Sequence, residues 1–86
     1  MVTLFDGQEL RVGRETGKHM LTLHGEGVSR VHCLITVREG SIIVRDLGSS
    51  NGTWLNGKRL TSEQDTPISK GDVLAIGSPK ERFEVQ

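Results

Sequence analysis

Three short segments of this sequence combine turn-forming residues with side chains that bind anions. They are Gly13-Arg14, Ser29-Arg30 and Ser50-Asn51. An arginine guanidinium can hold two oxygens of one anion at once, a geometry that lysine lacks. Serine hydroxyls and the asparagine amide add short, directed hydrogen-bond donors. The residue types therefore indicate anion-binding groups in three separate segments of the chain.

The third segment belongs to a run of small and polar residues, 46–53, that lies between two strand-like pieces. Gly48 and Gly52 allow backbone conformations that are closed to other residues. Ser49, Ser50 and Asn51 can hydrogen-bond either the loop itself or a guest. Taken alone, such a cluster is most often only a turn. The two upstream segments favour a binding edge instead.

Length and composition limit the classes of function. The chain has 86 residues, with 11 basic and 11 acidic side chains. A chain of this length forms one small domain, so we expect residues 1–86 to be a single domain, excised from a larger protein. The charges cancel, which leaves no global field to attract nucleic acid or an anionic membrane. We therefore expect neither as a partner.

Cysteine content and hydropathy indicate the compartment. The only cysteine, Cys33, cannot form an internal disulfide, which favours a reducing environment. No apolar run approaches the roughly 20 residues that span a bilayer. We expect an intracellular protein, cytoplasmic or, in a eukaryote, nuclear.

Short strand-like segments and tight turns run through the whole chain. We expect strands near residues 2–5, 10–12, 20–23, 31–37, 41–46, 53–55, 58–60, 73–76 and 82–85, and a loop over 61–66. Asn56-Gly57 favours a type I′ hairpin turn. No helical period is long enough to propose a helix. The pattern predicts an all-β, antiparallel sandwich or barrel, whose loops at one end carry the function.

In this order and at these spacings, the three segments make the chain resemble a forkhead-associated (FHA) domain. The resemblance covers about residues 11–77 and rests on Gly13-Arg14, on Ser29-Arg30-Val31-His32 and on the run 46–57. It implies an FHA/SMAD-like antiparallel β-sandwich that binds phosphothreonine peptides and reads out a Ser/Thr kinase in signalling. We expect no enzyme activity, no cofactor and no metal.

The resemblance also implies roles for single residues. Arg14 and Ser29 hold the phosphate, Ser29 through its hydroxyl and also its backbone amide. Arg30 adds a second charge or contacts the peptide backbone, and Ser50 lies at the edge of the phosphothreonine pocket. Asn51 hydrogen-bonds the peptide main chain, because its amide both donates and accepts. Taken singly, an arginine beside a glycine is more often a solvated surface charge.

Other residues are expected to support the site and not to touch the ligand. His32 braces the loops by hydrogen bonding, as the resemblance implies. Gly13 and Gly52 supply backbone freedom, and Trp54 is expected to pack in the core.

Enzyme and metal functions were weighed and are disfavoured. Ser29, His32 and Asp46 have the residue types of a hydrolase triad, but no nucleophile-elbow pattern surrounds the serine. The side chains that could bind a metal are His19, His24, His32 and Cys33. These side chains lack the paired spacing that is typical of metal ligands. His32 and Cys33 are neighbours on the expected strand, so their side chains point to opposite faces of the sheet.

The stronger alternative is an FHA-like domain that acts as a phosphate-independent scaffold or oligomerisation module within a larger protein. Two departures from the family pattern bear on it. Met20 stands where an acidic or amide residue is usual, and Gly27 stands where many members carry a side chain that reads the peptide. The presence of Arg14, Ser29 and Asn51 favours phosphopeptide binding.

Overall fold

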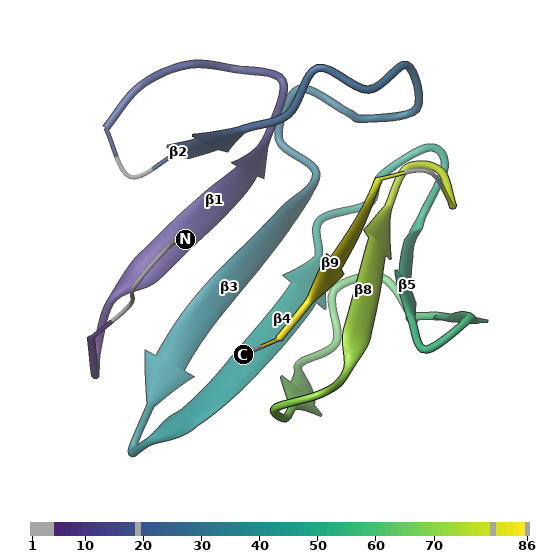
Figure 1. The fold of residues 1–86 in the computed structure, drawn as a ribbon. Helices are drawn as coiled ribbons and strands as arrows, with labels where there is room; N and C mark the ends of the chain where they lie inside the picture. Colours follow the sequence, from purple (N-terminus) through teal and green to yellow (C-terminus); the bar gives the residue numbers. More distant parts are fainter. Residues whose placement is uncertain (1–4, 19, 80, 86) are drawn as a thin grey trace.

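The computed structural model describes residues 5–18, 20–79 and 81–85, and within these ranges every regular element is a strand. The strands are β1 (Glu9–Gly13), β2 (Met20–Thr22), β3 (Cys33–Arg38), β4 (Ser41–Asp46), β5 (Thr53–Leu55), β6 (Lys58–Arg59), β7 (Thr66–Ile68), β8 (Val73–Ile76) and β9 (Arg82–Glu84). They form a five-stranded sheet, β2-β1-β3-β4-β7, and a four-stranded sheet, β6-β5-β8-β9 (Figure 1). The described residues contain no helix that could cross a membrane. The predicted all-β sandwich is confirmed.

Alternating burial explains why these segments form strands around one core. In β1, Leu10 and Val12 are buried while Arg11 between them is exposed, because successive side chains point to opposite faces of a sheet. Both sheets contribute to the core, whose buried members are Val12, Leu23, Val28, Cys33, Val44, Ile68, Leu74 and Ile76. The two sheets therefore pack on each other through a single apolar layer.

Tight turns join the antiparallel neighbours as the sequence predicts. Asn56 and Gly57 have φ angles of 50° and 85° between β5 and β6, and Glu39 and Gly40 have φ angles of 52° and 79° between β3 and β4. Two successive residues with positive φ are the mark of a type I′ turn, which matches the twist of paired strands. The hairpin predicted at Asn56-Gly57 is confirmed.

Two element predictions need correction. Thr66 was expected to end a loop and no strand was expected at 67–68, but residues 66–68 form β7 at the edge of the five-stranded sheet. A proline is tolerated there because an edge strand needs hydrogen-bond donors on one side only. β1 and β2, whose pairing was not predicted, are parallel. β3 begins at Cys33, two residues later than predicted.

Of the strand expected near residues 2–5, residues 2–4 lie outside the described ranges. Phe5 itself is in no strand and is 73% exposed. A turn at Asp6-Gly7 follows it.

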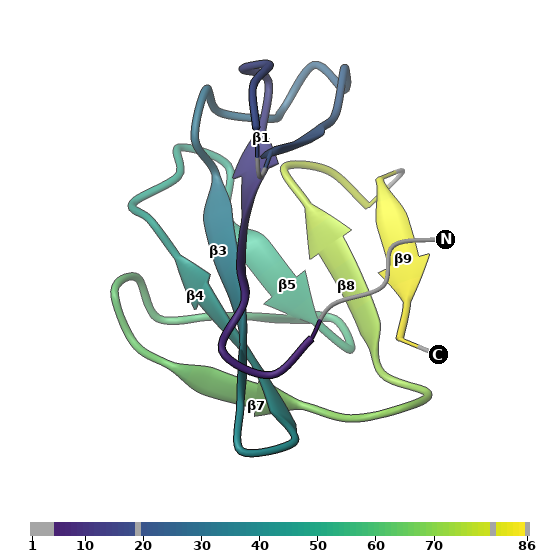
Figure 2. The same ribbon diagram turned by 90° about the vertical axis from the view of Figure 1, so that its left-hand side faces the viewer.

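The strand register places the important loops at one end of the molecule. Gly13 pairs with Thr22, so β1 and β2 end together. Val12 pairs with Cys33, and Cys33 pairs with Asp46, so β3 begins and β4 ends at that same edge. The connections that follow β1, β2 and β4 therefore gather there, at the upper end of the molecule in Figures 1 and 2.

Candidate functional site

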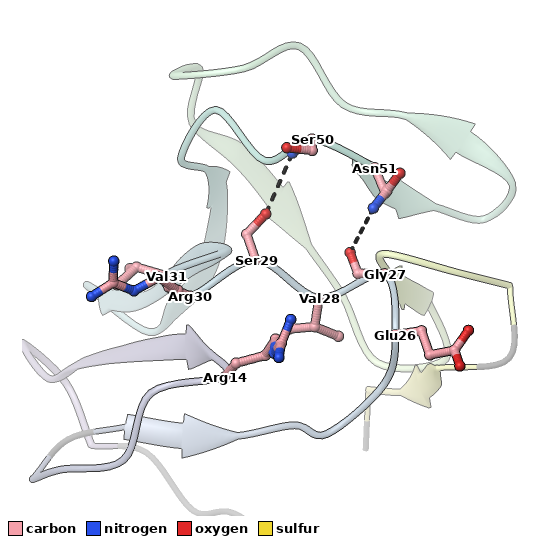
Figure 3. A pocket seen from close by; sticks show the side chains of 9 residues that line it. All are labelled: Arg14, Glu26, Gly27, Val28, Ser29, Arg30, Val31, Ser50 and Asn51. Carbon is pink, nitrogen blue, oxygen red and sulfur yellow. Dashed lines mark hydrogen bonds between the residues drawn. The ribbon is translucent and has the colours of Figure 1, made fainter.

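The loops at this end line an open surface pocket of about 500 Å³ (Figure 3). Its lining residues are Arg14, Glu26, Gly27, Val28, Ser29, Arg30, Val31, Ser50 and Asn51. All five residues that were predicted to contact a ligand are in this set. The structure thus brings together three segments that lie far apart in the sequence.

Arg14 follows β1 directly and supplies the available cation of the pocket. Its backbone N–H donates to the carbonyl of Ser29 at 3.0 Å, which fixes the two loops against each other. Its side chain is exposed and has no hydrogen-bond or ion-pair partner within the described part of the chain. Figure 3 shows the side chain lying beside Val28. The guanidinium is therefore free to bind an anion.

Ser29 has one free donor and not the two expected. Its backbone N–H donates to Nδ1 of His32 at 3.0 Å, so this amide is not available to a ligand. Its Oγ accepts a long hydrogen bond from the backbone N–H of Ser50 at 3.4 Å. Because the hydroxyl accepts there, its own proton can still be donated to a guest.

Arg30 lies at the pocket's edge with its charge already engaged. Its guanidinium forms an ion pair with Glu15 at 3.5 Å, and the Arg30 side chain is 86% exposed. Exposed pairs of this kind are weak, so Arg30 can exchange partners at small cost. The guanidinium has five N–H donors and this pair uses one nitrogen, so the predicted contact with phosphate or peptide remains open to it.

Asn51 reaches across the pocket to the neighbouring loop. Its Nδ2 donates to the carbonyl of Gly27 at 3.1 Å (Figure 3). Oδ1 of the same amide has no hydrogen-bond donor among the described residues. The side chain can therefore still accept from a peptide N–H and donate through its second amide proton.

Trp54 supports the Asn51 loop from outside and does not enter the core, contrary to expectation. It is only partly buried, and its Nε1 donates to the carbonyl of Asn51 at 3.2 Å. The Arg59 guanidinium lies over the indole ring, 5.9 Å from its centroid, and makes a long 3.5 Å contact with the carbonyl of Ser50. Arg59 was not predicted to belong to the site.

His32 joins the loops of the two sheets. It is fully buried, and its Nδ1 accepts from the amide of Ser29. Its Nε2 therefore carries the proton and donates to the carbonyl of Gly52 at 2.7 Å. That carbonyl also accepts from the amide of Gly77 at 3.0 Å. These contacts have the geometry that a bracing role requires, and they occupy both ring nitrogens with backbone groups.

The predicted glycines stand where a side chain would not fit. Gly13 does not need the backbone freedom that was expected of it, because its φ is not positive; a Cβ there would instead lie 2.2 Å from the carbonyl oxygen of Arg30. Gly52 has a φ of +88°, and a Cβ there would meet the side chains of Arg59 and Trp54.

Asp46 is a further support residue, which the sequence analysis considered only as a triad member. It is buried, and its carboxylate accepts from the backbone amides of Gly48 and Ser49 and from the hydroxyls of Ser49, Thr53 and Ser62. An aspartate two residues before a glycine in a turn is the pattern that indicates such an Asx turn.

The candidate metal ligands can be located in part. No three His, Cys, Asp or Glu side chains converge in the described part of the chain, and His19 lies outside the described ranges. Burial, and then the negative charge of Asp46, raise the pKa of the Cys33 thiol to about 12. Cys33 therefore remains a protonated, inert thiol.

Comparisons with known proteins agree with this architecture. The model of the FHA domain matches residues 10–77. An FHA domain-containing protein of Arabidopsis thaliana is 37% identical over 71 residues, which cover 83% of this chain and 18% of that protein. The chain spans between 10% and 18% of the length of three curated relatives that it matches.

Solved FHA domains have the same fold. The FHA domain of a Chlamydia trachomatis protein superposes with a TM-score of 0.77 at 28% identity, covering 86% of this chain and 72% of that one. The MEK1 FHA domain, solved with a phosphothreonine peptide of HOP1, gives 0.80 at 27% identity, covering 96% and 83%. Because the family match takes in most of the chain, including all three loops of the pocket, this chain belongs to the FHA-domain family.

Proposed function

We propose that this domain binds phosphothreonine-containing segments of other proteins and so mediates interactions that depend on a Ser/Thr kinase. The observation that carries the proposal is the unpaired guanidinium of Arg14, which shares one pocket with the Ser29 hydroxyl and the Asn51 amide. FHA domains are binding modules, and the MEK1 relative holds a phosphothreonine peptide. No catalytic step is required of these residues.

The chemistry of a phosphate monoester fits this arrangement. Near neutral pH the group carries close to two negative charges and several strong acceptors, so it needs a cation and directed donors. Arg14 supplies the cation and two parallel N–H donors, and the Ser29 hydroxyl supplies another. Asn51 is free to hydrogen-bond the peptide main chain beside the phosphate. The pocket lining also includes Val28 and Val31, against which a threonine methyl group can pack.

The kinase, the partner and the compartment follow as parts of the same proposal. Threonine phosphorylation by ATP-dependent kinases takes place inside cells, so we propose an intracellular protein, cytoplasmic or, in a eukaryote, nuclear. A partner would be a protein with an accessible, extended phosphothreonine segment.

Loss of the Arg14 guanidinium tests the function directly. Arg14→Ala should weaken phosphothreonine-peptide binding by about 3 kcal/mol or more, because two charge-assisted hydrogen bonds of roughly 1.5–3 kcal/mol each are lost. Calorimetric titration of a phosphothreonine peptide library, with the strongest peptide repeated on the variant, measures the loss. Arg11→Ala is the matched control, since Arg11 is an exposed arginine on β1 outside the pocket.

Two parallel titrations define what is recognised. Unphosphorylated peptides should not bind, and phosphoserine peptides should bind more weakly by at least the value of one buried methyl group, about 0.8 kcal/mol. Equal binding of phosphorylated and unphosphorylated peptides by the folded domain would overturn the proposal and support the phosphate-independent scaffold.

A further inference from the structure

The pocket carries opposite charges at its two ends. Arg14 and Arg30 line it together with Glu26. Figure 3 shows Arg30 and Glu26 at opposite ends, with Arg14 between them, and Glu26 lies beyond the Gly27 carbonyl that Asn51 contacts. Glu26 is exposed and has no ion-pair partner within the described ranges. A phosphate site does not need this carboxylate, which is of the wrong sign for the anion.

A second carboxylate lies next to the same end. A Cβ on Gly25 would stand 2.6 Å from Oε1 of Glu81, so the Glu81 side chain packs directly against the residue that precedes Glu26. Two backbone hydrogen bonds hold Glu81 in the β8–β9 connection, from the Ile76 amide to the Glu81 carbonyl and from the Glu81 amide to the Ser78 carbonyl. The acidic end, defined as Glu26 and Glu81, therefore comes from two connections, one of them held in place by the second sheet.

We propose that the acidic end selects phosphothreonine peptides with a lysine or arginine on one side of the phosphothreonine. The inference rests on the proposed function. A peptide whose phosphate is held by Arg14 and whose main chain is held by Asn51 runs past Gly27, next to Glu26. A basic side chain there meets the carboxylates of Glu26 and Glu81, which form no ion pair among the described residues, and an acidic one is repelled.

Charge at one end also fixes the direction of the peptide. An extended peptide whose phosphate is bound at the arginines can leave the pocket over Gly27 or in the opposite direction. Only a segment that leaves over Gly27 passes the acidic end. The preference should therefore appear on a single side of the phosphothreonine. Gly27 has no side chain that could supply this selection, since a Cβ there would lie 2.2 Å from the Gly77 carbonyl oxygen.

The test uses one phosphothreonine peptide in which lysine, alanine or glutamate is placed in turn at each flanking position within four residues. We expect lysine to bind about two- to fivefold more tightly than alanine, and glutamate more weakly than alanine by a similar factor, as for exposed ion pairs. The effect should be confined to one or two positions on one side. It should shrink in 0.5 M salt, because exposed charges are screened.

Variants assign the preference to the acidic end. Glu26→Gln should reduce the lysine preference, and Glu26→Lys should invert it in favour of glutamate. Glu81→Gln should reduce it further in the Glu26→Gln background. Glu9→Gln is the matched control, because Glu9 is an exposed carboxylate on β1 outside the pocket. Thermal melts check that each variant is folded.

The outcomes separate this inference from the proposed function. If the peptides bind through Arg14 but lysine, alanine and glutamate are equivalent at every position, the proposed function holds and the selection is overturned. A lysine preference that survives Glu26→Gln and Glu26→Lys also overturns it. If no phosphothreonine peptide binds, the proposed function and the selection are overturned together.

Discussion

At the residue scale, Asp46 shows how a buried carboxylate shapes the loop that presents Ser50 and Asn51. The side chain is only 3% exposed, and it accepts hydrogen bonds from two amides and three hydroxyls. Burial alone raises its pKa, but the hydrogen bonds from Ser49, Thr53 and Ser62 outweigh burial and hold the pKa below its ordinary value. The loop therefore folds around an ionised group.

Replacing this carboxylate should destabilise the domain strongly. In Asp46→Asn an amide nitrogen replaces one acceptor oxygen, and donors that were paired with a charge become unsatisfied. We expect a loss of about 2–4 kcal/mol in the free energy of unfolding, measured by urea denaturation. Asp65→Asn is the control, because its ion pairs with Arg45 at 2.8 Å and with Arg38 at 3.8 Å are exposed and each costs under about 1 kcal/mol to remove. Similar losses in both variants would contradict the role given to Asp46.

The pH dependence of stability provides a second check on the same substitution. The folded-state pKa of Asp46 lies below the value of 3.8 expected for an unperturbed carboxyl. The folded protein thus binds fewer protons than the unfolded chain in this range, so stability falls as the solution becomes more acidic. The contribution of Asp46 should be complete above pH 3.8 and disappear as the pH drops through the folded pKa. Asp46→Asn should lose stability less steeply in that window than the wild type.

At the element scale, three connections meet through backbone atoms alone. A Cβ on Gly27 would lie 2.2 Å from the Gly77 carbonyl oxygen, and one on Gly77 would lie 2.3 Å from the Gly27 carbonyl oxygen. The Gly77 amide in turn donates to Gly52. This close approach ties the β2–β3, β4–β5 and β8–β9 connections together behind the pocket. The close approach explains why residue 27 is a glycine, where many family members carry a side chain that reads the peptide.

Alanine substitutions at Gly77 and Gly71 should separate the free-energy cost of steric crowding from that of backbone strain. Gly77 and Gly71 both have positive φ, +76° and +93°, but a Cβ on Gly71 would meet nothing within 4 Å. Gly71→Ala should cost only the strain of the left-handed conformation, about 1–2 kcal/mol. Gly77→Ala should cost about 1–3 kcal/mol more, because the backbones must move apart. Urea denaturation of the two variants measures the difference in the free energy of unfolding. Equal losses in both would mean that the connections move apart at no cost in free energy.

The elements differ in how far local sequence determines them. The β5–β6 hairpin could be predicted because Asn56-Gly57 adopts positive φ at little cost. β7 could not, since Pro67 argues against a strand unless the strand is known to lie at an edge. The parallel pairing of β1 with β2 could not be predicted either. It depends on which strand edges remain open after β3 has paired with β1, a property of the assembled sheet.

At the scale of the whole molecule, the sequence could predict which residues bind a ligand but not how the folded chain places them around a pocket. Arg14, Ser29 and Asn51 stand out by type and spacing, and the family resemblance supplies their convergence. Glu26 does not stand out, because a glutamate between two glycines looks like a solvated turn residue until the pocket is formed. Its position results from the packing of both sheets, which local patterns do not encode.

Because the pocket exists only when the sheets are packed, ligand binding and global stability must be linked. A phosphothreonine peptide at a hundred times its Kd should stabilise the fold by about 2.7 kcal/mol. For a domain of this size that corresponds to a rise in Tm on the order of 10 °C, measured by a thermal melt. Arg14→Ala should abolish the rise and leave the Tm of the free domain nearly unchanged, since the side chain is exposed and unpaired.

His32→Ala should do the opposite to the free domain. It removes a fully buried ring and leaves the Ser29 amide without its acceptor, so the Tm without peptide should fall by several degrees. The peptide-induced rise should also shrink, because Ser29 and Gly52 are no longer held together. If Arg14→Ala instead lowers the free Tm as much as His32→Ala does, Arg14 is part of the architecture. The two variants thus distinguish Arg14, the group that binds the anion, from His32, the group that holds the loops of the two sheets together around it.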